Sequence, residues 1–181
     1  VEVQPCFMQN TPWYYRNKVQ MPIGYNKDHY LITGFYKQRT NDIIACQECL
    51  IQNHESNDII QRVKELFEIY HVEPYDKVTH QGNIKHILTK KGYHSQEMML
   101  CLITYEKTIH HIEDIVSILK KEFKNLKTII QNVNHRHDNV ILGDEEIVST
   151  VSGRMGSGVF DFNIGNLKSR TLSRVTVNNS Q

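Results

Sequence analysis

Aromatic and basic side chains alternate near the N-terminus, in the part of the chain whose chemistry is most suggestive. Alternate side chains of a β-strand point to opposite faces, so Tyr14, Arg16 and Lys18 would share one face. Arginine and lysine beside aromatic rings suit a phosphate backbone and stacked bases. We therefore expect a nucleic-acid-binding hairpin that uses Arg16, Lys18, Lys37 and Arg39. The alternative is an ordinary half-buried hairpin with a solvated basic face.

The four cysteines include one Cys-x-x-Cys pair, Cys46 and Cys49. A tetrahedral metal site needs four ligands, and no second pair follows at a usable spacing because Cys6 and Cys101 are isolated. A thioredoxin-like use of the pair would require a strand-to-helix turn in a Rossmann-like setting, which the pattern lacks. From the residues alone, two incidental thiols are the preferred interpretation.

Two histidine clusters and one glycine-rich run are weaker candidates for chemistry. His110 and His111 would point about 100° apart on a helix, so they are poorly placed to chelate one ion. His135 and His137 lie in a polar stretch and are interpreted as solvated loop histidines. The glycine-rich run at 153–158 lacks the Lys-Ser/Thr ending of a phosphate-binding loop, and we interpret it as a turn.

Composition limits the classes of protein to consider. The 181 residues are 39% hydrophobic and 23% charged, which is typical of a globular protein. No apolar run reaches the 18 or so residues of a membrane-spanning helix, and no signal peptide is visible, so we expect a cytoplasmic protein with reduced thiols and no membrane partner. The net charge is only +1, so any RNA surface must be local. Val1 is not an initiator methionine, which suggests a longer gene product.

The first half of the chain predicts a hairpin and a helix. The hairpin would pair residues 13–19 with residues 30–37 across a turn rich in Gly, Asn and Asp. Either Asn53 or Ser56 would cap the helix, which ends before Pro74. Apolar residues at helical spacing form its buried stripe. They are Ile59, Ile60, Val63, Leu66, Phe67 and Tyr70.

The second half repeats this order and adds strands. On the first strand of its hairpin we expect Ile84, His86 and Leu88 to share a face. The expected elements are strands at 83–91 and 96–104, a helix at about 110–123, a strand at 127–134 and short strands at 140–142 and 147–151. The order hairpin, helix, hairpin, helix, strands predicts one α+β domain over 1–181, with a mainly antiparallel sheet and two principal helices.

Several short motifs resemble the RNA 5-methyluridine methyltransferases of the TrmA/RumA type. They are Pro-Trp-x-Tyr-Arg-Asn-Lys from Pro12, Gly-Phe-Tyr-Lys-x-Arg-x-x-Asp-Ile-Ile from Gly34, Cys-Leu-Ile-Gln from Cys49, Gly-Asn-Ile-Lys-His-Ile from Gly82 and Ile-Gln-Asn-Val-Asn from Ile130. The resemblance covers roughly residues 12–153. It rests on the order and spacing of these motifs together.

The resemblance implies a fragment of an enzyme that methylates uridine with S-adenosylmethionine, and it favours 23S rRNA over tRNA as the substrate. This chain would be the central domain, without the N-terminal barrel and the C-terminal Rossmann-like catalytic domain. It would bind and position RNA and be inactive and cofactor-free alone. Cys49 matches the fourth ligand of a [4Fe–4S] cluster that some members hold, but the other three ligands are absent from this chain. A stand-alone RNA-binding or scaffolding domain and a protein-interaction domain are the alternatives.

The resemblance is weakest near the C-terminus. The family pattern Phe-x-Ile-Ser-Pro-x-Ser-Phe-Phe-Gln-Val-Asn corresponds to residues 167–178, where Ser173, Val177 and Asn178 fit. Thr176 replaces the expected glutamine, so the cofactor contact that this glutamine makes in the family is not expected here.

Overall fold

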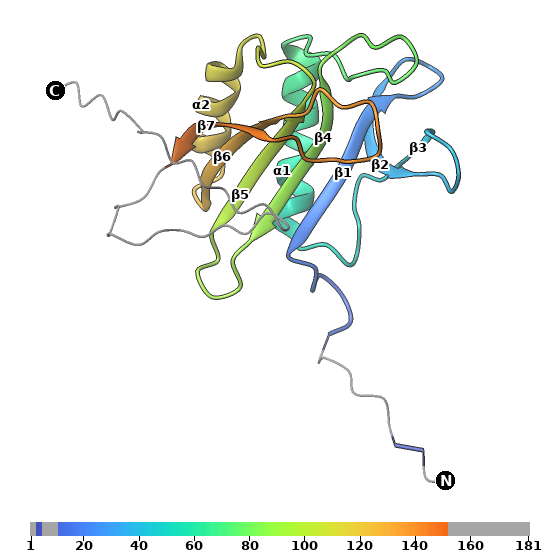
Figure 1. Cartoon of the computed structure of the whole chain (residues 1–181). Helices are drawn as coiled ribbons and strands as arrows, with labels where there is room; N and C mark the ends of the chain where they lie inside the picture. The colour runs from blue at the N-terminus through green and yellow to red at the C-terminus, as the bar shows by residue number, and fades with distance from the viewer. Residues whose placement is uncertain (1–2, 5–10, 152–181) are drawn as a thin grey trace, which may run out of the picture.

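The computed structural model describes residues 3–4 and 11–151, which build one seven-stranded sheet with two helices. The sheet order is β3-β2-β1-β4-β5-β6-β7, and both helices pack on the same face (Figure 1). The elements are β1 (Lys18–Tyr25), β2 (Leu31–Tyr36), β3 (Ile43–Ala45), α1 (His54–Ile69), β4 (Ile84–Lys91), β5 (Met98–Thr104), α2 (Ile112–Glu122), β6 (Leu126–Val133) and β7 (Glu145–Val151).

The predicted α+β class is confirmed, but the prediction of a mainly antiparallel sheet needs correction because the sheet is mixed. Strand β6 runs parallel to β5, while the other neighbouring strands are antiparallel. A parallel neighbour cannot be reached by a tight hairpin, so the chain crosses over through α2 between these two strands. The short strand β3 was not predicted.

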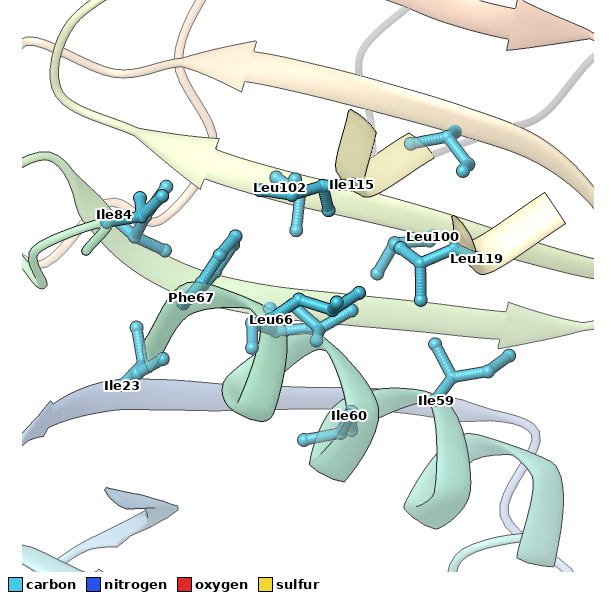
Figure 2. Packing of buried hydrophobic residues seen from close by; sticks show 14 of the residues in the cluster. Ile23, Ile59, Ile60, Leu66, Phe67, Ile84, Leu100, Leu102, Ile115 and Leu119 are labelled. Carbon is cyan, nitrogen blue, oxygen red and sulfur yellow. The ribbon is translucent and has the colours of Figure 1, made fainter. Parts of the chain in front are cut away.

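The helices cover the sheet with the apolar stripe that the sequence predicts. The side chain of Asn53 caps α1 by accepting a hydrogen bond from the Ser56 N–H at 2.9 Å. Figure 2 shows side chains of α1 and α2 meeting those of β1, β4 and β5 in one cluster. Burying each large apolar side chain contributes about 1.5–3 kcal/mol, so this face holds the principal core.

The predicted strand at 13–19 is wrong in its first half. Tyr14 has a left-handed backbone with φ of 55°, and β1 begins only at Lys18. The N–H groups of Tyr14 and Arg16 donate to the carbonyls of Leu50 and Ile51, in the segment that leads into α1. Tyr14, Arg16 and Lys18 therefore do not line one face of a strand, because the left-handed residue interrupts the alternation.

The prediction that Ile84, His86 and Leu88 share one face of the strand is wrong for Ile84, because β4 contains a bulge. The register of β4 against β5 shifts between Ile84 and His86, and a bulge inserts one extra residue into a strand. Ile84 and Ile87 therefore both point into the helix-covered core, whereas Leu88 belongs to a second apolar cluster on the other face. His86 shares that other face with Leu88, but Ile84 does not.

The segment 134–144 lies across the face without helices. Residues 140–142 are not the predicted strand, while the strand predicted at 147–151 is present within β7. Ile141 and Leu142 pack on a cluster formed by Leu88, Met99, Cys101, Ile103 and Ile130. In Figure 1 this segment, drawn in orange, passes on the side away from α1 and α2. Among residues 3–4 and 11–151, no helix is long and apolar enough to cross a membrane.

Candidate nucleic-acid interface

A pocket of about 240 Å³ opens beside the segment 134–141, at the edge of the helix-free face. Five stretches of the chain form its walls. They are Ile23 of β1, the end of β2 and the turn after it, residues 75–80, the start of β4, and the segment after β6. The polar and aromatic lining residues are Tyr36, Thr40, Asn41, Tyr75, Lys77, His80, Lys85, His86, Asn134, Arg136, His137, Asp138 and Asn139.

One wall of the pocket is a rigid cluster of tyrosine and histidine rings. Tyr75, which is 8% exposed, stacks on Tyr105 with ring centroids 4.8 Å apart. Its hydroxyl lies 2.7 Å from Nδ1 of His80 and 2.9 Å from Nδ1 of His137. His137 is exposed in a loop, as predicted, and its hydrogen bond also ties the segment after β6 to Tyr75. This cluster is therefore framework for the pocket.

Lys85 anchors the same segment from β4. Its Nζ donates to the carbonyls of Asn134 at 2.8 Å and Arg136 at 2.6 Å. The ammonium also lies 4.7 Å from the ring centroid of Tyr75, a cation–π distance. Desolvation, followed by the positive charge of Lys77, lowers the pKa of Lys85. Lys85 therefore positions the pocket wall and contributes charge to it.

Two further cations stand at the pocket with their charges accessible. The Lys77 ammonium lies 4.8 Å above the ring of Tyr36 and 3.4 Å from the Asn41 side-chain oxygen. Arg136 pairs with Asp138, and both side chains of this pair are about half exposed. Exposed ion pairs contribute little to stability, so either cation can turn to an incoming anion at small cost.

His86 lies at the base of the pocket without a partner for one ring nitrogen. The residue is 8% exposed, and its Nδ1 has no hydrogen-bond partner among the described residues. Burial, together with Lys77 and Lys85, lowers the pKa of His86 to about 4. The imidazole is therefore neutral at physiological pH and offers one uncommitted hydrogen-bonding atom.

A second basic group lies on the same face of the sheet. Lys18 of β1 stands directly opposite Lys90 of β4 in the antiparallel register. Like charges directly opposite on two strands are destabilising unless an anion lies between them. The neighbouring Lys91 is already paired, with its Nζ 2.6 Å from Glu55. Lys18 and Lys90 thus leave a local positive charge that a phosphate would neutralise.

The structure divides the four predicted RNA contacts between these two places. Lys37 and Arg39 are exposed in the turn between β2 and β3, whose Thr40 lines the pocket. Arg16 and Lys18 are exposed at the start of β1. The pairs separate because β2 pairs with β1 only as far as Thr33 and then pairs with β3. One hairpin face does not carry all four.

Sequence reasoning missed the pocket itself and the roles of Lys77, Lys85, His86 and Arg136. These residues come from three separate segments, so no local spacing could bring them together. The available signal was the polar run at 134–139 that directly follows an apolar strand, since such a run often forms a binding loop.

The cysteines do not form a metal site in the part of the chain that is described. Cys46 and Cys49 are free, half-buried thiols that pack against the main core, and Cys101 is fully buried. Among residues 3–4 and 11–151, no group of three or more His, Cys, Asp or Glu side chains could hold a metal ion. Thr176 and the expected cofactor motif lie outside the described residues, as do Cys6 and the glycine-rich run.

Comparison with known proteins identifies relatives over most of the chain. No protein-family model matches it. A Staphylococcus epidermidis protein named as an uncharacterized RNA methyltransferase is 40% identical over 136 residues, and an Enterococcus faecalis protein of the same name is 36% identical over 161 residues. These matches cover 75% and 89% of the chain. Over most of its length the chain is therefore similar to proteins named as RNA methyltransferases.

A solved structure shares the fold over most of the chain. The tRNA (uracil-54, C5)-methyltransferase of Pyrococcus abyssi, solved with S-adenosyl-L-homocysteine, superposes with a TM-score of 0.62 over 80% of the chain at 21% sequence identity. The chain spans only about a third of these proteins: 30% of the Staphylococcus relative, 35% of the Enterococcus relative and 32% of the Pyrococcus chain. The chain therefore aligns with one part of these longer proteins.

Proposed function

We propose that the chain is the central domain of an S-adenosylmethionine-dependent RNA uridine-C5 methyltransferase. In this proposal it holds folded RNA so that the target uridine can leave its stack and reach a separate catalytic domain. The observation that carries the proposal is the identity of 36–40% with RNA methyltransferases over most of the chain. The cation-rich pocket and the Lys18–Lys90 pair on one face of the sheet supply a surface suited to phosphates.

The chemistry in this proposal belongs to the longer protein. A cysteine thiolate would add to carbon 6 of the uracil, and carbon 5 would take the methyl group from S-adenosylmethionine, which leaves as S-adenosylhomocysteine. Loss of the proton from carbon 5 would then expel the thiolate from carbon 6 and restore the ring. The sequence of this chain contains no Ser-Cys-Asn-Pro motif to supply that thiolate, so we propose that it is inactive alone. Cys49 would complete a [4Fe–4S] cluster only with cysteines from outside this chain.

The substrate we propose is 23S rRNA, on the strength of the resemblance in the motifs. The alternative is tRNA, the substrate named for the Pyrococcus abyssi enzyme. The residues proposed to contact RNA are Arg16, Lys18, Lys37 and Arg39, joined by Lys77, Lys90 and Arg136, which the structure adds.

Salt-dependent RNA binding tests the proposed role of this surface. We expect Arg16→Ala with Lys18→Ala to flatten the slope of log affinity against log salt by about 1.4–1.8, at roughly 0.7–0.9 per lost phosphate contact. Lys37→Ala with Arg39→Ala should do the same. Lys121→Ala with Lys124→Ala removes equal charge from the exposed region around the end of α2 and should leave the slope unchanged.

Two results would contradict this assignment. Equal loss of affinity in all three double variants would mean that only total charge matters. A lower melting temperature with an unchanged salt slope would mean that the side chains of Arg16 and Lys18 support the fold rather than contact RNA. Thermal melts and fluorescence titrations at several salt concentrations measure both.

A further inference from the structure

We propose that the pocket beside the segment 134–141 seats one unstacked nucleotide of the bound RNA. The inference rests on the proposed function, since it assumes that RNA lies on this face. It assigns a specific role to Tyr36, Lys77, His86 and Arg136: base recognition for the tyrosine and histidine, and phosphate binding for the two cations.

The orphaned nitrogen of His86 is the observation that points to a ligand. Leaving a buried polar atom without a hydrogen bond is unfavourable, so such atoms normally have partners. His86 lines the pocket, but its Nδ1 is buried, so a base would reach this nitrogen only when the side chains that cover it move aside. A base edge carries both N–H donors and carbonyl acceptors, so the uncovered Nδ1 of a neutral imidazole can bond to a base in either tautomer.

Tyr36 provides the platform for that base. Its ring is 38% exposed and stands edge-on to His86, with centroids 6.1 Å apart. The Lys77 ammonium covers one face of the ring at 4.8 Å from its centroid, a weak cation–π contact. A base stacking on this face would be the stronger contact and would displace the ammonium.

Once displaced from the Tyr36 ring, the Lys77 ammonium can bind the phosphate of the nucleotide in the same pocket. A nucleotide brings its own phosphate, and Lys77 and Arg136 are the cations near the opening that are not fixed by buried carbonyls. Lys85 is held by two carbonyl groups, and Asp138 is the acid lining the pocket. With three cations and one carboxylate around it, the pocket favours a ligand of negative charge.

The size of the pocket selects among ligands. At about 240 Å³ it lies below the roughly 300–1,000 Å³ of sites that enclose drug-sized molecules. It therefore suits one base with part of its sugar and phosphate rather than a whole S-adenosylmethionine. Tyr75 is not a contact in this assignment, because its hydroxyl is already bonded to His80 and His137.

The test uses the full chain with three probes: hexauridylate, uridine 5′-monophosphate and inorganic phosphate. Nitrogen-15 NMR of the histidine rings reports on His86 directly, and a titration gives affinity. We expect hexauridylate, and more weakly the mononucleotide, to shift the ring nitrogens of His86, while inorganic phosphate leaves them unmoved. Tyr36→Leu and Lys77→Ala should each lower hexauridylate affinity at least fivefold, and Lys121→Ala should not.

The possible outcomes distinguish the proposed nucleotide pocket from the proposed function on which it rests. RNA binding that survives Tyr36→Leu while the His86 ring stays unmoved overturns the nucleotide pocket and leaves the proposed function standing. Phosphate alone shifting His86 as strongly as hexauridylate overturns the assignment of a base to the site. Failure of hexauridylate and of folded 23S rRNA fragments to bind at all overturns both proposals. Melting curves confirm that each variant is folded.

Discussion

His86 shows how one side chain can link stability to the pocket. Its pKa in the folded protein is about 4, below the ordinary histidine value near 6.5, because burial disfavours the charged ring. As the pH falls, the unfolded chain takes up the proton first. The stability associated with His86 is therefore fully present above pH 6.5 and is lost as the pH falls toward 4.

We predict that His86→Leu removes part of the acid sensitivity of the protein. Between pH 7.5 and pH 4.5, titration of His86 should lower the free energy of unfolding of the wild-type protein by about 2–3 kcal/mol. The leucine variant should not show this decrease, because leucine does not titrate. Urea unfolding at the two pH values measures this difference. His110→Leu, at an exposed position, is the matched control and should keep the wild-type pH dependence. A variant at position 86 that loses stability in acid as steeply as the wild type would contradict the account.

Exposure of the individual basic residues could be predicted, but their grouping could not. Arg16, Lys18, Lys37 and Arg39 are exposed as expected of charged side chains. Their division into two groups depends on the left-handed backbone of Tyr14, which has no sequence signal such as glycine. The burial of His86 was equally hidden, because it follows from a bulge and from a segment about 50 residues away.

At the scale of elements, two buried asparagines hold the segment 134–144 over the helix-free face. The Asn132 side chain accepts a hydrogen bond from the Gly143 N–H at 2.7 Å and donates to its carbonyl at 3.1 Å. The Asn134 side chain donates to the carbonyls of Val140 and Ile141 at 2.7 and 2.9 Å. Gly143 itself approaches the backbone closely, since a Cβ there would lie 1.9 Å from the Val133 carbonyl oxygen.

We predict that Asn134→Ala destabilises the protein by about 2–4 kcal/mol, since it leaves two carbonyl groups without their donor. Amide hydrogen exchange in residues 136–142 should also speed up, because the segment loses its internal brace. Asn139→Ala, an exposed asparagine in the same segment, is the control and should change stability by less than about 0.5 kcal/mol. Equal effects of the two variants would show that Asn134 does not brace the segment.

The periodic elements were predictable, and the sheet order was not. The stripe of α1 and the strands β4 and β5 follow from apolar spacing, which burial imposes directly. A three-residue strand such as β3 is too short to show alternation. The parallel direction of β6 depends on where α2 packs, since the apolar composition of a strand is the same in either direction.

At the scale of the whole molecule, the central claim is that this chain is part of an RNA uridine-C5 methyltransferase. Its relatives are RNA methyltransferases, and it spans about a third of their length. The surface described above would then act on a reaction completed elsewhere in the same protein. Loss of the gene should therefore remove one modification from one class of RNA.

Nucleoside analysis of RNA from cells with and without the gene tests that claim most directly. Mass spectrometry of separately digested 23S rRNA and tRNA measures 5-methyluridine in each. The account predicts that 5-methyluridine falls in 23S rRNA when the gene is deleted and returns when the intact gene is restored. A fall confined to tRNA would change the substrate and keep the reaction. Unchanged 5-methyluridine in both RNAs would contradict the account.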